Sequence, residues 1–73
     1  MRVYVEPVGL LKRTFNATVV ELQNKSTIQD LIQVFNLPKE LRAIALIKGK
    51  RQSHDHNLED GDSVKLVCLA LGG

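Results

Sequence analysis

The chain has 73 residues, a formal net charge of +2, and charged side chains at 25% of its composition. A single domain of this size buries only about 60% of its unfolded surface, which leaves no room for a deep active-site cleft. The charge is also far below the dense basic footprint of a dedicated nucleic-acid binder, which argues against nucleic acid as a partner.

The polar start of the chain and its lone cysteine indicate the cellular compartment in which the protein is expected. Residues 1–6 are polar at alternate positions, and no long apolar stretch follows that would form a signal peptide or a membrane span. Cys68 cannot form an internal disulfide. We therefore expect a cytoplasmic protein without a membrane partner.

The first third of the chain predicts two strands. Residues 1–6 alternate apolar and polar side chains, and Pro7 and Gly9 are expected to end this strand. Residues 10–13 are too many for a two-residue turn, so a looser loop follows. A second β-rich segment over residues 15–22 carries apolar side chains on both parities, which requires either a bulge or burial of one end on both sides.

A helix is the clearest element of the sequence. Ser26 and Gln29 have the spacing of a capping box. Asn36 and Pro38 end the helix, because a residue before proline is disfavoured in helical geometry. The apolar residues at helical spacing, which predict the buried face, are Ile28, Leu31, Ile32 and Phe35.

The second half of the chain returns to strands. Residues 43–47 form a short apolar run, and a Lys48-Gly49 turn, a polar loop over 50–57 and a last strand over 62–69 follow. This order indicates an α+β protein of the β-grasp type. One helix would pack on one face of a mixed sheet of four to five strands, with the first and last strands paired in parallel.

The C-terminal residues are the candidate functional site. We expect a β-grasp domain over residues 1–69 and a flexible tail over 70–73, composed of Ala70, Leu71, Gly72 and Gly73. A bare Gly-Gly backbone fits a channel too narrow for side chains. A terminal carboxylate is ionised and unreactive at neutral pH, so another protein must activate it. We therefore expect a carrier and not an enzyme.

The segment 58–64 followed by Gly72-Gly73 resembles the C-terminal signature of the ThiS and MoaD sulfur-carrier proteins, prokaryotic relatives of ubiquitin. Within it, Gly61 suits a turn that needs a positive φ, and Asp60 and Asp62 can close this turn onto their own backbone. The resemblance covers the whole chain in element order and length. Its specific residues lie in the last third.

The resemblance implies a reaction sequence in which partner enzymes do the chemistry. A ubiquitin-activating-type adenylyltransferase would adenylate the Gly73 carboxylate with ATP, and a sulfur donor of the cysteine desulfurase or rhodanese type would convert it to a thiocarboxylate. Thiazole synthase, for thiamine biosynthesis, or the large subunit of molybdopterin synthase would then receive the sulfur. The carrier itself would hold no bound cofactor.

The branch and the use of the tail have alternatives. Molybdopterin-branch members usually carry a Pro-Pro pair where this chain has Cys68 and Leu69, whereas the short overall length is closer to the thiamin branch. The Asn-Gly turn often seen after the third strand is Lys48-Gly49 here. A ubiquitin-like protein modifier conjugated to target lysines through Gly73, and a non-catalytic β-grasp interaction module, are the alternative functions.

The last strand also predicts a partner-binding face. Val64, Leu66 and Cys68 share one parity, and Val67 and Leu69 share the other. Because the helix covers one sheet face, we expect Val67 and Leu69 to form an exposed apolar patch with residues of the 43–47 run. The alternative is a core that wraps round the end of the strand.

Three further features have a functional and a plain interpretation, and the plain one is favoured in each case. His54 and His56 could be two metal ligands, but no third or fourth has an obvious source, so a solvated loop without metal is expected. Cys68 is expected to be a small buried hydrophobe, not a redox thiol. A solvated turn is favoured over a site for an acidic partner or nucleic acid in the basic cluster of Lys48, Lys50 and Arg51, which Lys39 and Arg42 could join.

Overall fold

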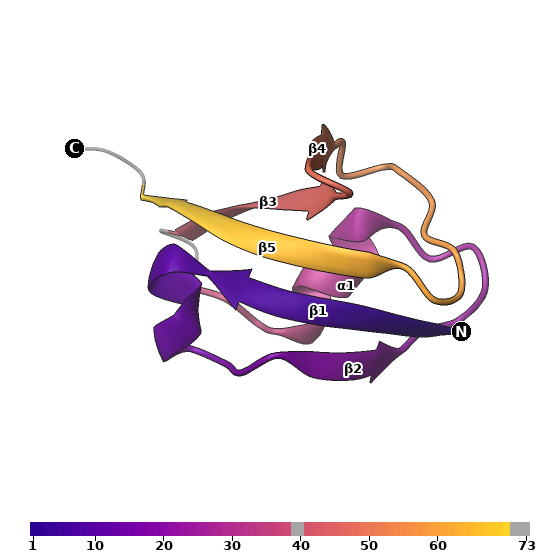
Figure 1. The fold of residues 1–73 in the computed structure, drawn as a ribbon, viewed down its shortest axis with the longest axis horizontal. Helices are drawn as coiled ribbons and strands as arrows, with labels where there is room; N and C mark the ends of the chain where they lie inside the picture. Colours follow the sequence, from indigo (N-terminus) through magenta and orange to yellow (C-terminus); the bar gives the residue numbers. More distant parts are fainter. Residues whose placement is uncertain (39–40, 71–73) are drawn as a thin grey trace.

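The computed structural model describes residues 1–38 and 41–70, and these form an α+β domain (Figure 1). It contains five strands, one α-helix and one short 3-10 helix. In chain order the elements are β1 (Arg2–Val8), η1 (Gly9–Arg13), β2 (Thr18–Glu21), α1 (Ile28–Val34), β3 (Leu41–Ile47), β4 (Lys50–Gln52) and β5 (Ser63–Ala70).

The strands form one mixed sheet in the order β2-β1-β5-β3-β4. β1 and β5 are parallel neighbours at its centre, and the other pairs are antiparallel. α1 crosses behind this sheet in the view of Figure 1, and none of the described helices covers the facing side. The predicted β-grasp arrangement, with its parallel first and last strands, is therefore confirmed.

The core lies between α1 and the sheet. Val3 and Val5 of β1 alternate with exposed residues, and Val64 and Leu66 of β5 pack beside them. From the helix, Ile28 and Leu31 are fully buried, while Ile32 and Phe35 are half-buried and pack against the same cluster. The predicted apolar face of the helix is thus the face that packs on the sheet.

The helix cap lies one residue later than the sequence predicted. Thr27 is the N-cap: its Oγ1 accepts a hydrogen bond from Asp30 N at 3.3 Å, and Asp30 Oδ2 accepts one from Thr27 N at 2.9 Å. Ser26 is occupied differently, because its hydroxyl donates to Gln23 O and its carbonyl accepts from Leu58 N. Ser26–Gln29 and Thr27–Asp30 have the same spacing, and the contacts to Gln23 and Leu58 decide between them.

β1 continues past Pro7, which was predicted to end it. Tyr4 N donates to Asp62 O at 2.8 Å, so the N–H groups of even-numbered β1 residues point toward β5. The nitrogen of Pro7 therefore points to the β2 side. The pairing with β2 stops at Val5 and Thr18, so a missing N–H at Pro7 costs no ladder hydrogen bond.

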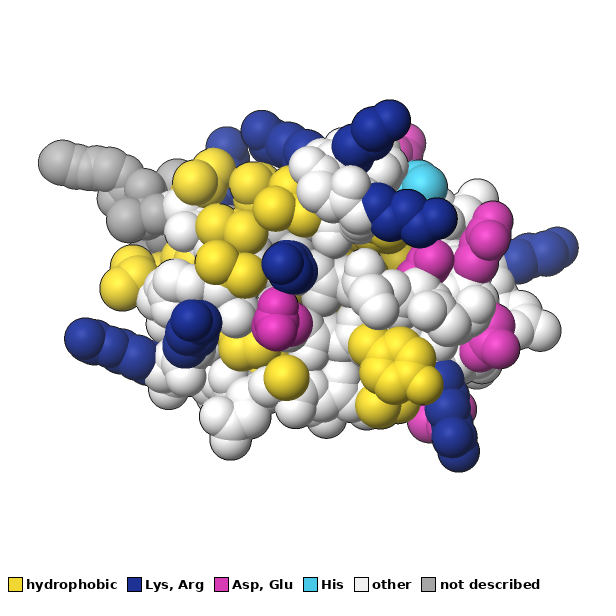
Figure 2. Space-filling model, in the orientation of Figure 1, with side chains coloured by type: hydrophobic (Ala, Val, Ile, Leu, Met, Phe, Trp, Pro, Cys, Tyr) yellow, Lys and Arg dark blue, Asp and Glu magenta, His cyan; other side chains and the backbone are white. Residues whose placement is uncertain are grey.

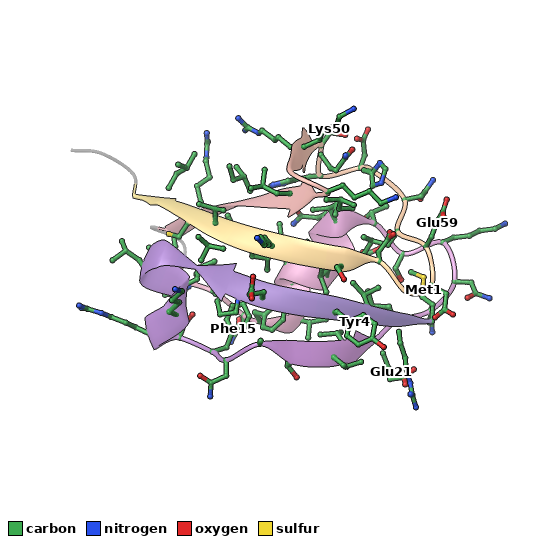
Figure 3. The ribbon with its side chains drawn as sticks, in the orientation of Figure 1. Met1, Tyr4, Phe15, Glu21, Lys50 and Glu59 are labelled. Carbon is green, nitrogen blue, oxygen red and sulfur yellow. The ribbon has the colours of Figure 1, made fainter. Side chains whose placement is uncertain are left out.

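Apolar side chains fall on both parities of residues 15–22 because only part of this segment is a strand. β2 starts at Thr18, and Phe15 precedes it, between η1 and β2 (Figure 3). The Phe15 ring stacks on Phe35 just after α1, with centroids 4.1 Å apart. Val20 faces the core and Val19 faces away from it, and the described segment forms one regular ladder with β1.

Two short elements escaped the sequence analysis. The predicted loose loop is a 3-10 helix, η1, which buries Leu11 completely. The predicted polar loop begins with β4, whose three residues pair with Ala45–Ile47 across the Lys48-Gly49 turn. Both residues of this turn have positive φ, 52° and 78°, as a two-residue hairpin with a type I′ turn requires.

The turn before β5 is partly as predicted. Gly61 has a φ of 89°, and Asp62 Oδ2 closes the turn by accepting from Glu59 N at 2.8 Å. Asp60 was expected to bond within the turn but instead accepts from Arg2 N of β1 at 2.7 Å. Gly61 N also donates to Arg2 O, so this turn is anchored to the start of β1.

Leu31→Ala tests the helix-to-sheet core. We expect the free energy of unfolding to fall by about 2–5 kcal/mol, because a fully buried side chain is removed. Val34→Ala on the same helix is the matched control, since Val34 is 52% exposed and its truncation should change stability by less than about 0.5 kcal/mol. Chemical denaturation of both variants measures the difference, and equal losses would contradict this packing.

Candidate functional site

The face of the sheet away from α1 carries the predicted partner surface. We call this side the open face; its side chains alternate with the core residues along each strand. It presents Tyr4, Glu6, Val8, Val19, Arg42, Ile44, Leu46, Lys65, Val67 and Leu69.

Four apolar side chains meet on the open face near the end of β5, and we call them the apolar patch: Val8, Ile44, Val67 and Leu69. Strand register brings three of them into one row, because Val67 of β5 lies opposite Val8 of β1 on one side and Ile44 of β3 on the other. Leu69 follows on β5 and is 45% exposed. Figure 2 shows hydrophobic side chains gathered on this part of the face. Val67 and Leu69 thus lie on the side that the alternation predicted.

An ion pair divides the open face. Lys65 Nζ lies 3.9 Å from Glu6 Oε2, and both side chains are more than half exposed, so the pair contributes little stability. Beyond it, Tyr4 and Val19 are cross-strand neighbours, 50% and 47% exposed. Figure 3 shows Tyr4 on β1 near the N-terminal end, away from the apolar patch.

The predicted acyl site lies outside the described residues. Leu71, Gly72 and Gly73 are not described. Ala70 is the last residue of β5, and its backbone pairs with Leu41. The strand therefore runs one residue further than predicted. β5 is the middle strand of the sheet, so its last described residue, Ala70, belongs to the central strand and comes directly after the apolar patch.

Cys68 lies on the helix side of β5. It is half-buried, faces the same side as Val64 and Leu66, and packs against the core cluster. Its partner in the ladder is Ala43 of β3. The side chain thus occupies the position expected of a small hydrophobe.

The two histidines hold the helix through main-chain atoms. The carbonyl oxygens of His54 and His56 accept hydrogen bonds from Gln29 N and Ile28 N, at 2.8 and 3.0 Å. The His54 ring Nε2 lies 3.1 Å from Ala43 O. Within residues 1–38 and 41–70, no three His, Cys, Asp or Glu side chains gather in a way that could hold a metal ion.

Asp55, between these histidines, is held by its own loop. The Ser53 hydroxyl donates to Asp55 Oδ1 at 2.5 Å. This hydrogen bond, helped by one from the backbone, holds the pKa of Asp55 below its usual value. The segment 53–57 is therefore an ordered connection that also satisfies the first amides of α1.

The predicted basic cluster divides between two places. Lys48 lies in the β3–β4 turn and Lys50 directly after it, while Arg42 and Arg51 line a groove of about 400 Å³ beside β3. Lys39, also predicted in the cluster, lies outside the described residues. The sequence analysis did not foresee this groove, because it depends on how far β4 extends along β3.

Two crystal structures of an archaeal protein share the fold. SAMP1 from Haloferax volcanii superposes with a TM-score of 0.73 at 13% identity, over all of both chains. A crystal structure of H. volcanii small archaeal modifier protein 1 gives 0.72 at 12% identity, over 90% of this chain and 94% of that one. No protein-family model matches the chain, and no curated protein is significantly similar in sequence.

The fold is a ubiquitin-like β-grasp. The likeness extends over the whole five-stranded sheet and its helix, and at such low identity it concerns the fold alone. No helix in the described part of the chain is long and apolar enough to cross a membrane.

The sequence analysis missed several members of the open face. Val8 was placed beyond the first strand, although it belongs to β1 and contributes to the apolar patch. Tyr4 and Val19 come together only through the β1–β2 register. The alternation of residues 2–8 was a usable signal for Val8, but the Pro7-Gly9 pair concealed it.

Proposed function

We propose that this chain is a ubiquitin-like sulfur carrier whose C-terminal Gly73 is the acyl site. The observation that supports it most is the place of β5: this central strand of a ubiquitin-like sheet is described as far as Ala70, and Gly73 follows it by three positions in the sequence. Those three residues end in Gly-Gly, which suits a narrow channel in a partner.

The proposed chemistry takes place in partner enzymes, with ATP. A carboxylate oxygen of Gly73 attacks the α-phosphate of ATP and displaces pyrophosphate, which gives an acyl adenylate. Sulfide then attacks the acyl carbon and releases AMP, leaving a thiocarboxylate. A persulfide donor, such as a cysteine desulfurase or rhodanese, would also need a thiol to cleave the acyl disulfide it forms. The chain contributes the carboxylate and its delivery, so it is not itself the enzyme.

The apolar patch is the proposed docking surface for the adenylyltransferase. Val67 and Leu69 belong to the strand that leads into the tail, so a partner bound there receives Gly73 within a few residues' reach. Leu69 is exposed and the other three patch residues are half-buried, and a contiguous apolar patch on a surface is often a partner site. Docking on β5 would hold the carboxylate near the ATP site of the enzyme before any chemistry occurs.

The proposal also covers the enzyme that accepts the sulfur. Thiazole synthase is proposed first and the large subunit of molybdopterin synthase second, because Cys68 and Leu69 occupy the positions of the Pro-Pro pair typical of the molybdopterin branch. ATP-dependent activation and a thiol supply both point to the cytoplasm.

A protein modifier is the second candidate function. It is favoured by the crystal structures that share the fold, which are of a small archaeal modifier protein. In this case the activated Gly73 carbonyl would be attacked by a lysine amine of a target protein, AMP or an enzyme thiol would leave, and an isopeptide bond would form. A non-catalytic interaction module with an inert tail is the third candidate.

Mass spectrometry of the C-terminus separates these functions. Incubation with ATP, magnesium, sulfide and a ubiquitin-activating-type adenylyltransferase should give a species about 16 Da heavier, since one oxygen is replaced by sulfur. Deleting Gly73 should abolish this product, and Gly72→Val should block it because a β-branched side chain obstructs a channel shaped for backbone. An isopeptide-linked adduct would support the modifier function. A tail that no partner activates would leave only the interaction module.

Leu69→Asp tests the docking surface separately from the tail. We expect at least a tenfold loss of affinity for the adenylyltransferase, because a charge enters the apolar patch. The melting temperature should change little, since Leu69 is 45% exposed. Val19→Asp is the matched control: Val19 has a similar exposure of 47% on the same face but lies beyond the Lys65–Glu6 pair. Equal losses of affinity in both variants, or unfolding of Leu69→Asp, would refute the proposed surface.

A further inference from the structure

The outer edge of β3 is only half covered. Along its inner edge β3 pairs with β5 from Leu41 to Ile47, but β4 pairs only with Ala45–Ile47. Figure 1 shows β4 beside the C-terminal end of β3 alone. No strand among the described residues pairs with the outer edge at residues 42–44, so it offers main-chain groups to an added strand.

One of these main-chain groups, the Ala43 carbonyl, has a side-chain partner that an added strand could displace. The Ala43 carbonyl points to the outer edge, because it lies 3.1 Å from the His54 ring Nε2 on that side. In antiparallel pairing the N–H and C=O of one residue point to the same edge, so Ala43 N–H points outward as well. A side-chain ring thus occupies the place where a neighbouring strand would supply an N–H donor.

The groove at this edge has a strongly one-sided charge. Its volume is about 400 Å³, and it is lined by Arg42, Ala43 and Ile44 on β3 and by Arg51, Ser53 and His54 across from them. No carboxylate is among the described residues that line it. The two ion pairs of the described chain, Arg2–Glu21 and Lys65–Glu6, lie elsewhere.

Asp55, the acidic residue nearest in sequence, does not line the groove. Its carboxylate accepts the Ser53 hydroxyl. Two guanidinium groups in one groove repel each other, and each can bind a carboxylate through two parallel hydrogen bonds. The complementary occupant is therefore an anion that also satisfies the edge of β3.

We propose that residues 42–44 of β3 and Arg51 bind an extended acidic segment of a partner protein, which adds to the sheet as a sixth strand. Its backbone exchanges hydrogen bonds with Ala43 after the His54 ring moves aside. Its carboxylates, projecting on the open face, pair with Arg42 and Arg51. This mode of binding takes its affinity from main-chain bonds and its specificity from the side chains on alternate positions.

This site is independent of the tail. It involves neither Gly73 nor β5, and an added strand extends the sheet in its own plane. Binding at this site can therefore be tested whether or not the C-terminus is activated.

The test uses the full chain and a blocked heptapeptide, Glu-Val-Glu-Val-Glu-Val-Glu. In a ¹⁵N-labelled titration the Ala43 amide should shift, and its hydrogen exchange should slow at least tenfold in the complex. Arg42→Glu and Arg51→Glu should each weaken binding at least tenfold. Arg13→Glu, an equal charge change on η1, is the matched control and should have less than a twofold effect.

Two further comparisons separate strand addition from simple charge attraction. His54→Ala should strengthen binding two- to tenfold, because the ring no longer competes for Ala43 O, while the main-chain bond from Gln29 N remains. A peptide with proline in place of the central valine should lose at least tenfold, since it lacks an N–H donor.

The proposal is overturned by any of three results: no peptide binding, equal binding of the proline peptide, or equal weakening by Arg13→Glu. Single-stranded RNA that binds this groove more tightly than the peptide would also overturn it. The spectrum of each free variant shows whether the fold is retained, and Arg42→Gln and Arg51→Gln, which remove the charge without reversing it, replace any variant that unfolds.

Discussion

The structure depends on one constraint: in the described part of the chain one α-helix, of seven residues, covers only one face of a five-stranded sheet. The central strand β5 is apolar on both sides, with Val64 and Leu66 toward the helix and Val67 and Leu69 away from it. The helix side becomes the core. The other side stays open and keeps its apolar residues in contact with water, which is costly unless a partner covers them.

So short a helix also needs help from outside itself. Two turns of α-helix are not stable alone, because nucleation is costly and few hydrogen bonds repay it. Here the loop before β5 supplies what is missing: the carbonyls of His54 and His56 accept the amides of Gln29 and Ile28, and Thr27 bridges to Asn57. The histidines that could suggest a metal site are thus part of the support of α1.

The sequence was a good guide wherever a periodic pattern was enough. The 3.6-residue spacing of Ile28 and Leu31 identified the buried helix face, and the alternation in β5 separated Val64 from Val67. It was a poor guide to elements whose bounds are set by contacts between residues far apart in the sequence. β4 is polar and is held by pairing across one turn, and β1 passes Pro7 because β2 ends before it.

The same limit applies to the candidate site. Val67 and Leu69 could be placed on the open face from their parity alone. Their neighbours Val8 and Ile44 could not, because the register between strands far apart in sequence has no local signal. The contact of the His54 ring with Ala43 O, on which the edge groove depends, is of the same kind.

The arrangement of the two proposed surfaces allows both to be occupied together. The apolar patch lies flat on the open face over β1, β5 and β3, whereas the edge groove opens sideways from β3. Ile44 belongs to both, so a strand added beside it would continue the patch outward and would not cover it. A partner that carries an acidic strand next to an apolar surface would gain from both contacts at once, because the second forms within the complex made by the first. Such a partner would also hold β5, and with it the start of the tail, in a defined orientation.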